Sequence, residues 1–284
     1  MWYVAGMRIA ALLLAVAACS SSSAPPPATK TTAPTENKPA ETGPLSEAEF
    51  KAMHEPPTSP PQNLKGQVID LNGTKAYLSV PPGPGPHPGI VVIHEWWGLN
   101  GNIEHWADRL AGTGWAALAI DLYGGTVATT PDQAMAAMKG VDPAKAKATL
   151  DAAIEFLAKD PRVAANKRAV IGWCFGGGWS LQTALAHPEL DGVIMYYGQL
   201  ETDPGKLGVI KGQLLGVFAN RDKGIPPAQV DKFEAALKTA GVKATIYRYD
   251  ADHAFANPSN PKYDEKSAGD AWSHVLAFLD NLKK

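Results

Sequence analysis

The chain has few cysteines, little net charge and no apolar run of membrane-spanning length near its start. Its 284 residues include only Cys19 and Cys174, which excludes a disulfide-stapled scaffold. The formal net charge of −2 gives no support for nucleic-acid binding. No His and Cys cluster with metal-ligand spacing is visible, so we expect neither a metal nor an organic cofactor. The apolar run at residues 9–18 has ten residues, too few to cross a bilayer.

The first 45 residues are typical of an export signal followed by a tether. Arg8 precedes the apolar run and small residues precede Cys19, as in a secretory signal peptide covering residues 1–18. The stretch at 16–19, V-A-A-C, resembles a bacterial lipobox, which implies a lipidated Cys19 and attachment to a membrane of the cell envelope. Residues 19–45 are rich in Ser, Pro, Thr and Ala, and we predict a disordered tether. A buried first helix is the alternative for the apolar run.

Residues 46–284 are predicted to form one α/β domain. The expected strands cover 66–71, 75–80, 89–94, 115–120, 169–171, 192–196, 213–219 and 243–249. The expected helices cover 45–54, 102–113, 131–139, 143–160, 179–187, 227–240 and 268–283. Alternating strands and helices favour a mostly parallel sheet flanked by helices, with a site beyond the carboxyl ends of the strands. Nothing in the sequence sets the oligomeric state, and a monomer is the simplest expectation.

The segment at 169–180, A-V-I-G-W-C-F-G-G-G-W-S, has the layout of a nucleophile elbow. A buried strand runs into a sharp turn that carries Cys174, and a helix follows. Side chains at Gly172 and Gly176 would collide with such a turn, and the helix N-terminus favours a thiolate. A dinucleotide-binding loop fits poorly because Cys174 stands where the second glycine should be. A small buried cysteine is the other interpretation.

A cysteine nucleophile needs a base, and the base needs a group that orients it. His253 follows the last predicted strand, where the base is expected, whereas His187 and His274 lie in helices. Asp222 follows the strand after the elbow unit and is the preferred acid. Weaker candidates for the acid are Asp203, Asp250 and Asp252.

With these residues the chain resembles the dienelactone hydrolase family of α/β hydrolases from about residue 66 onward. The resemblance is carried by H-E-W-W-G at 94–98, D-L-Y at 121–123, G-W-C-F-G-G at 172–177, Y-Y-G at 196–198, the Asp222 segment and D-H-A-F at 252–255. It implies an α/β-hydrolase fold, a triad of Cys174, His253 and Asp222, and hydrolysis of an ester or lactone.

The resemblance also implies roles for residues beside the triad. Glu95 would hydrogen-bond the resting thiol until substrate displaces it, and the backbone N–H groups of Phe175 and Trp96 would form the oxyanion hole. The aromatic residues expected to line the substrate pocket are Trp97, Tyr123, Trp173, Tyr197 and Phe255. The family's substrate-binding arginines are missing, because Gly125 and Asn257 stand in the corresponding stretches.

The sequence therefore predicts an exported, membrane-tethered cysteine hydrolase that acts on a small ester or lactone. Two alternatives stay open. The same fold could cleave another bond, such as that of a peptide or polyester. The chain could also be a non-catalytic lipoprotein that binds a ligand, although every triad position is filled.

Overall fold

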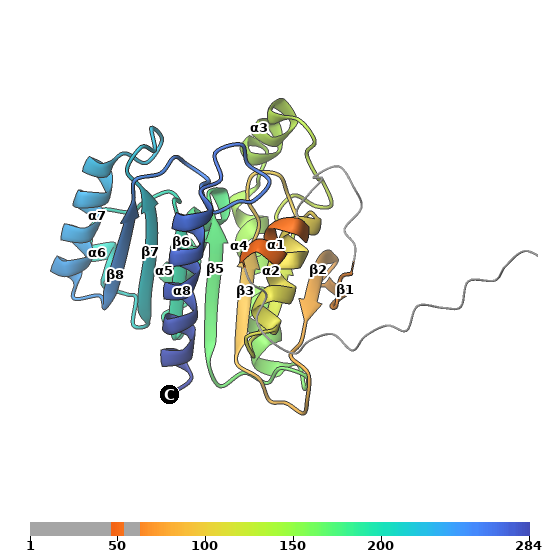
Figure 1. Cartoon of the computed structure of the whole chain (residues 1–284). Helices are drawn as coiled ribbons and strands as arrows, with labels where there is room; N and C mark the ends of the chain where they lie inside the picture. Colours follow the sequence, from red (N-terminus) through yellow and green to blue (C-terminus); the bar gives the residue numbers. More distant parts are fainter. Residues whose placement is uncertain (1–46, 54–62) are drawn as a thin grey trace, which may run out of the picture. The chain divides into compact units, whose positions relative to one another are not determined.

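The computed structural model describes residues 47–53 and 63–284 of the chain (Figure 1). The predicted signal peptide, Cys19 and tether all lie outside the described residues. Within the described residues, no helix is both long enough and apolar enough to cross a membrane.

The centre of the fold is an eight-stranded sheet with the order β1-β2-β4-β3-β5-β6-β7-β8. The strands are β1 (Gln67–Leu71), β2 (Thr74–Ser79), β3 (Gly89–Ile93), β4 (Ala116–Ile120), β5 (Arg168–Trp173), β6 (Gly192–Tyr196), β7 (Gln213–Ala219) and β8 (Ala244–Tyr249). β2 pairs antiparallel with β1 and β4, and all other neighbours are parallel. The predicted mostly parallel α/β sheet is confirmed.

The antiparallel end of the sheet begins with a two-residue hairpin. Leu71 pairs with Thr74, and the turn residues Asn72 and Gly73 have φ values of 53° and 83°. Positive φ at both positions is the type I′ geometry that Asn-Gly favours. The Asn-Gly pair between the expected strands at 66–71 and 75–80 therefore forms the turn of a hairpin.

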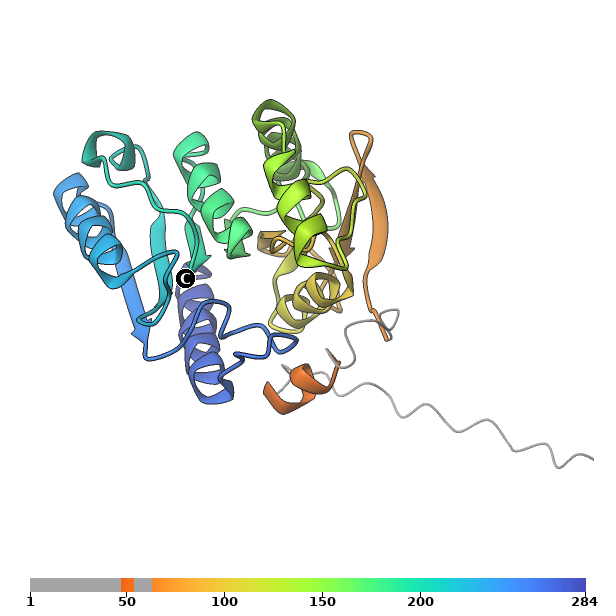
Figure 2. The ribbon, with the colours of Figure 1, turned by 90° about the horizontal axis from the view of Figure 1, so that it is seen from above.

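Helices cover both faces of the sheet (Figure 2). They are α1 (Glu47–Met53), α2 (Gly101–Ala111), α3 (Pro131–Lys139), α4 (Pro143–Lys159), α5 (Phe175–Ala186), α6 (Pro204–Leu207), α7 (Pro227–Ala240) and α8 (Glu265–Leu282). One apolar cluster joins α1, α2 and α8 to the sheet, and a second joins α4, α5, α6 and α7 to its other face.

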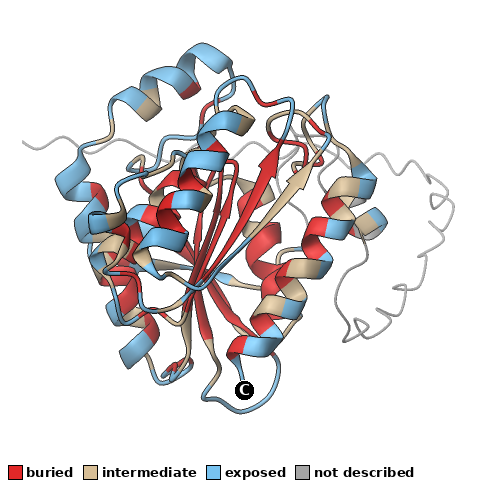
Figure 3. Ribbon diagram, turned by 90° about the vertical axis from the view of Figure 1, so that its left-hand side faces the viewer, coloured by how far each residue is buried: buried red, intermediate tan, exposed pale blue. Residues whose placement is uncertain are grey.

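Successive residues of the central strands point to opposite faces of the sheet and therefore belong alternately to the two apolar clusters. In β3, Ile90 and Val92 belong to the α2 side while Val91 and Ile93 belong to the α4 side. All five residues of β3 are buried, as are those of β4 and β6, which appear red in Figure 3. Continuous apolar strands of this kind are typical of a sheet buried on both faces.

α3 is the exception to this packing. Ala134 is its only buried residue, and the helix stands at the carboxyl end of the sheet, at the top of Figure 1. Its N-terminus is capped by Thr130, whose side chain accepts from the Gln133 N–H. As described below, its side chains Met135 and Met138 face the pocket at Cys174.

Candidate active site

Cys174 occupies a strained turn between β5 and α5. Its φ of 54° and ψ of −114° lie in a region that residues with a side chain rarely adopt. Close backbone approaches hold the turn: a Cβ on Gly172 would come within 2.3 Å of the Gly176 carbonyl oxygen, and a Cβ on Gly176 within 2.3 Å of the Ile93 carbonyl oxygen. These contacts explain the glycines that flank the cysteine, and they present the thiol at the N-terminus of α5.

The loop after β8 brings His253 to the thiol. Its Nε2 lies 3.1 Å from Cys174 Sγ, a hydrogen-bond distance for sulfur. Its ring packs against Tyr197 with centroids 5.0 Å apart. The two residues are 79 positions apart in the sequence, so only the parallel sheet brings them together.

Asp222 holds the far side of the imidazole ring. Its Oδ2 lies 2.5 Å from His253 Nδ1, while its Oδ1 accepts from the N–H groups of Gly224 and Ile225 at 2.8 and 3.1 Å. Burial alone would raise the pKa of Asp222, but the bond with His253 and these backbone donors hold the pKa below its ordinary value. Asp222 is therefore an anion at neutral pH.

The same contacts set the charge of His253. Burial alone would lower the pKa of His253, but its hydrogen bonds with Asp222 and Cys174 raise the pKa to about 10. The ring is thus a cation at neutral pH, and its Nε2 lies 3.1 Å from the Cys174 sulfur.

The other acid and base candidates lie elsewhere. Asp250 and Asp252 pair with Arg221. Asp203 caps α6, where its side chain accepts from the Gly205 N–H. His187 contacts Asp151 and Glu189, and His274 stacks on Tyr247. None of these side chains contacts Cys174 in the described part of the chain.

Glu95 lies beside the site, but its contacts differ from the expectation. Its Oε2 accepts a short hydrogen bond from Asn257 Nδ2, and its Oε1 has no partner among the described residues. The expected bond from Glu95 to the thiol is absent there, because Asn257 takes the carboxylate and His253 takes the sulfur. Burial raises the pKa of Glu95 to about 7, although His253 and Asn257 act in the opposite direction.

Asn257 has a definite orientation that the sequence did not reveal. Its Oδ1 accepts from the Ser259 N–H at 2.9 Å, so the amide nitrogen must face Glu95. Ser259 Oγ in turn accepts from Asn102 Nδ2 of α2 at 2.8 Å. In the sequence, Asn257 stands out only because it lies where the family has a substrate-binding arginine. Its partner is 162 positions away, which no local pattern reports.

The two expected oxyanion donors lie next to the thiol. Trp96 and Phe175 line the same pocket as Cys174 and His253. No acceptor for either backbone N–H is found within the described residues. The first amides of a helix, such as that of Phe175, have no intrahelical partner.

The pocket at Cys174 has a volume of about 640 Å³. Its lining is mostly apolar and aromatic and comes from the 96 loop, α3, α5 and the loops that follow β6, β7 and β8. The lining residues are Trp96, Met135, Met138, Cys174, Phe175, Gly178, Trp179, Gln182, Tyr197, Gln199, Gly224, Ile225 and His253. His253 is the only basic side chain in this lining.

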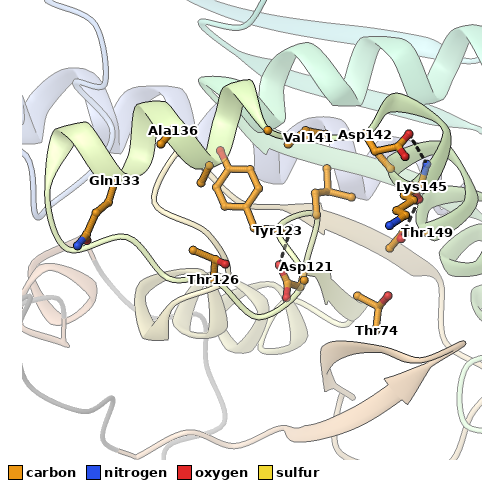
Figure 4. Close-up of a pocket in the computed structure, with 15 residues that line it drawn as sticks. Thr74, Asp121, Tyr123, Thr126, Gln133, Ala136, Val141, Asp142, Lys145 and Thr149 are labelled. Atoms are coloured by element: carbon orange, nitrogen blue, oxygen red, sulfur yellow. Dashed lines mark hydrogen bonds between the residues drawn. The ribbon is translucent and has the colours of Figure 1, made fainter.

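Of the five aromatic residues predicted to line the substrate pocket, only one lies in the wall of the pocket at Cys174. Tyr197 lines the pocket at Cys174. Tyr123 lines a separate pocket of about 550 Å³ between the 121–126 loop, α3 and α4 (Figure 4). Trp97 packs edge-on against Trp96. Trp173 and Phe255 were expected in the pocket wall, but they are absent from the lining of the pocket at Cys174 and pack in the core on the α2 and α8 side.

No group of three or more His, Cys, Asp or Glu side chains that could hold a metal is found in the described residues.

Comparison with known proteins shows the family of this chain. The model of the dienelactone hydrolase family matches residues 74–283. The chain belongs to the dienelactone hydrolase family. It is 32% identical over 227 residues to Protein usf of Aquifex pyrophilus, covering 75% of this chain and 97% of that protein. It is 30% identical over 215 residues to a provisionally named carboxymethylenebutenolidase of Methylorubrum extorquens, covering 70% and 74%.

Solved structures lead to the same family. A provisionally named dienelactone hydrolase from Klebsiella pneumoniae superposes with a TM-score of 0.69 at 27% identity, covering 75% of this chain and 96% of that one. Membership in the dienelactone hydrolase family makes this chain a hydrolase of ester or lactone bonds.

Proposed function

We propose that the protein is an exported, membrane-tethered cysteine hydrolase that cleaves neutral esters or lactones through Cys174, His253 and Asp222. The observation that supports this most directly is the continuous contact from Sγ to Nε2 at 3.1 Å and from Nδ1 to Oδ2 at 2.5 Å. Nucleophile, base and orienting carboxylate stand in the order that acyl transfer requires.

The reaction proceeds in two halves. The Cys174 thiolate attacks the carbonyl carbon, and the resulting oxyanion is held by the N–H groups of Trp96 and Phe175. His253 gives its Nε2 proton to the departing alkoxide, which leaves a thioester. Water then loses a proton to Nε2 as it attacks the thioester, and the second tetrahedral adduct collapses to acid and thiolate. Preorganised amide donors commonly contribute about 3 kcal/mol each.

The pocket supports uncharged substrates. Its lining places Trp96, Trp179, Met135 and Met138 around the thiol, and no Lys or Arg joins them. Neither Gly125 nor Asn257 can replace the bidentate grip of a guanidinium on a carboxylate. A preference for anionic esters would contradict this part of the proposal. Assays with a peptide and with a polyester beside the esters test whether the protein cleaves another type of bond.

The test of the triad is hydrolysis of a neutral aryl acetate by the full chain. Cys174→Ala should lower kcat/KM by roughly a thousandfold or more, because the acyl-enzyme can no longer form. Cys174→Ser keeps the shape of the site and serves as the matched control for packing. Wild-type turnover no higher than that of Cys174→Ala would refute the proposed function for this substrate class.

The tether is tested separately. Val16 to Cys19 supports lipidation at Cys19, so the mature protein should begin with a lipid-modified cysteine and fractionate with membranes. Mass measurement of the mature N-terminus gives the answer. Cys19→Ala should release the protein from the membrane fraction, and an unmodified start at another residue would refute the anchor.

A further inference from the structure

His94 is a fully buried histidine that the proposed mechanism does not use. It follows β3 directly and has 0% of its surface exposed. Both ring nitrogens are engaged: Nδ1 lies 2.6 Å from the Glu95 carbonyl oxygen, and Nε2 lies 3.1 Å from the Leu122 N–H. A carbonyl can only accept and an N–H can only donate, so the ring must be the neutral tautomer with its proton on Nδ1.

The burial of His94 agrees with this neutral form. Removal from water lowers the pKa of His94 to about 4, although its bond to Glu95 acts in the opposite direction. The ring thus keeps one donor and one acceptor over the whole neutral range. A group with fixed protonation and two fixed bonds is suited to hold backbone in place.

The carbonyl that His94 binds belongs to the peptide whose N–H is that of Trp96. A trans peptide is planar, so its C=O and N–H point in opposite directions. Gly98 donates its N–H to the same Glu95 oxygen at 3.3 Å. With the oxygen held by two donors, this peptide cannot rotate without breaking both bonds, and the direction of the Trp96 N–H is fixed.

His94 also touches the residue that carries the second oxyanion donor. Its ring stacks on Phe175 with centroids 5.5 Å apart and planes 16° apart. The adjoining Gly176 packs so closely that a Cβ there would lie 2.6 Å from the His94 carbonyl oxygen. The His94 residue therefore contacts both the 95–96 peptide and the first turn of α5.

From these contacts we infer that His94 is a positioning residue that sets the distance and direction of the two oxyanion-hole amides. The inference rests on the proposed function, because it assigns His94 to the oxyanion hole of that reaction. His94 is absent from the lining of the pocket at Cys174, so it acts through the Glu95–Trp96 peptide and Phe175.

A purely structural role is the competing explanation. His94 Nε2 joins the end of β3 to the Leu122 N–H that follows β4, and loss of this bond alone could loosen the sheet. Two reactions of Cys174 separate the explanations. Ester hydrolysis develops an oxyanion, whereas alkylation by iodoacetamide attacks a saturated carbon and develops none. Both need the thiolate and His253.

The experiment compares His94→Phe and His94→Asn with wild type in the full chain. Phe keeps an aromatic ring against Phe175 but loses both hydrogen bonds. Asn places an amide nitrogen as many bonds from Cα as Nδ1 and can still donate to the Glu95 oxygen. We expect His94→Phe to lower kcat for a neutral aryl ester by roughly tenfold to a hundredfold, with KM within about threefold, since loss of one oxyanion donor costs roughly a hundredfold or more.

The alkylation rate should stay within about threefold of wild type in both variants, and His94→Asn should recover about half or more of the lost ester activity on a logarithmic scale. Equal losses in alkylation and hydrolysis, or unchanged hydrolysis in His94→Phe, would overturn the inference. Wild-type hydrolysis no faster than that of Cys174→Ala would instead refute the proposed function. Nitrogen NMR of the wild-type imidazole needs no variant: a proton on Nε2 of His94, or titration near neutral pH, also overturns the inference.

Discussion

Asp222 and Glu95 are two buried carboxyl groups close to one thiol, at 4% and 7% exposure, yet their environments push them in opposite directions. Asp222 has His253 on one oxygen and two backbone N–H groups on the other. Glu95 has Asn257 on one oxygen and nothing on the other among the described residues. The pKa of Asp222 is therefore lowered, while burial raises that of Glu95 to about 7. The donors around Asp222 outweigh the effect of its burial, whereas those around Glu95 do not.

The largest expected effect on the rate comes from removing the negative charge of Asp222. Asp222→Asn replaces the anion with an amide that can donate to Nδ1, which favours the wrong imidazole tautomer. We expect kcat/KM for a neutral aryl ester to fall by roughly 10²- to 10⁴-fold. Asp203→Asn, an aspartate that caps α6 away from the thiol, is the matched control and should change the rate by less than about twofold. A fall of less than about tenfold in Asp222→Asn would argue against its orienting role.

Substitution of Glu95 should change the stability of the protein more than its rate of ester hydrolysis. Its folded-state pKa of about 7 exceeds the ordinary 4.5, so the folded state binds the extra proton. The contribution of Glu95 to stability is thus fully present below pH 4.5 and is lost as pH rises through about 7. Glu95→Gln cannot lose a proton, and at pH 8 it should be more stable than wild type by up to about 3 kcal/mol.

Urea unfolding of wild type and Glu95→Gln between pH 4.5 and 8 measures this difference. Groups other than Glu95, including His253, are common to both proteins and largely cancel. The exposed Asp132→Asn variant is the control for replacing a carboxyl group with an amide. A difference that is flat with pH, or that grows toward low pH, would show that Glu95 is ionised in the folded protein. The rate with neutral esters should change by less than about tenfold.

The smallest effect is expected from giving Glu95 a cationic partner, as Asp222 has in His253. Asn257→Arg places a cation at Glu95, which should lower the pKa of that carboxyl group and let the site attract anions. For a pair of aryl esters that differ only by a carboxylate, the preference should move toward the anionic ester by about tenfold. Asn257→Gln keeps a neutral amide and should leave the preference unchanged. An equal shift in both variants would mean that side-chain length, not charge, was the cause.

The sequence predicted the strands well because each leaves a local signal, and the structure brings Cys174, His253 and Asp222 into contact. Asn72-Gly73 indicates a hairpin, apolar runs indicate buried strands, and Cys174 between glycines indicates a sharp turn. Three helices were less accurate. The four-residue α6 was missed, and α5 begins at Phe175 instead of 179. α8 begins at Glu265 instead of 268 because its Asp264 cap precedes the first apolar position.

The contacts between distant segments could not be predicted in the same way. Nothing near Glu95 indicates that Asn257 will hold it, because that bond depends on how the loop after β8 folds back. Trp173 directly precedes Cys174 and Phe255 is two positions after His253, yet their side chains pack in the core. Proximity along the chain does not tell which way a side chain points when a strand or loop ends. The positioning role inferred for His94 depends on two hydrogen bonds and a ring contact that only the folded structure contains.

The loop after β8 carries both His253 and Asn257, four positions apart. Its first half places His253 between Cys174 and Asp222, and its second half places Asn257 against Glu95. Substitutions after Phe255 can therefore change the charge beside Glu95 while the contacts of the imidazole ring stay the same.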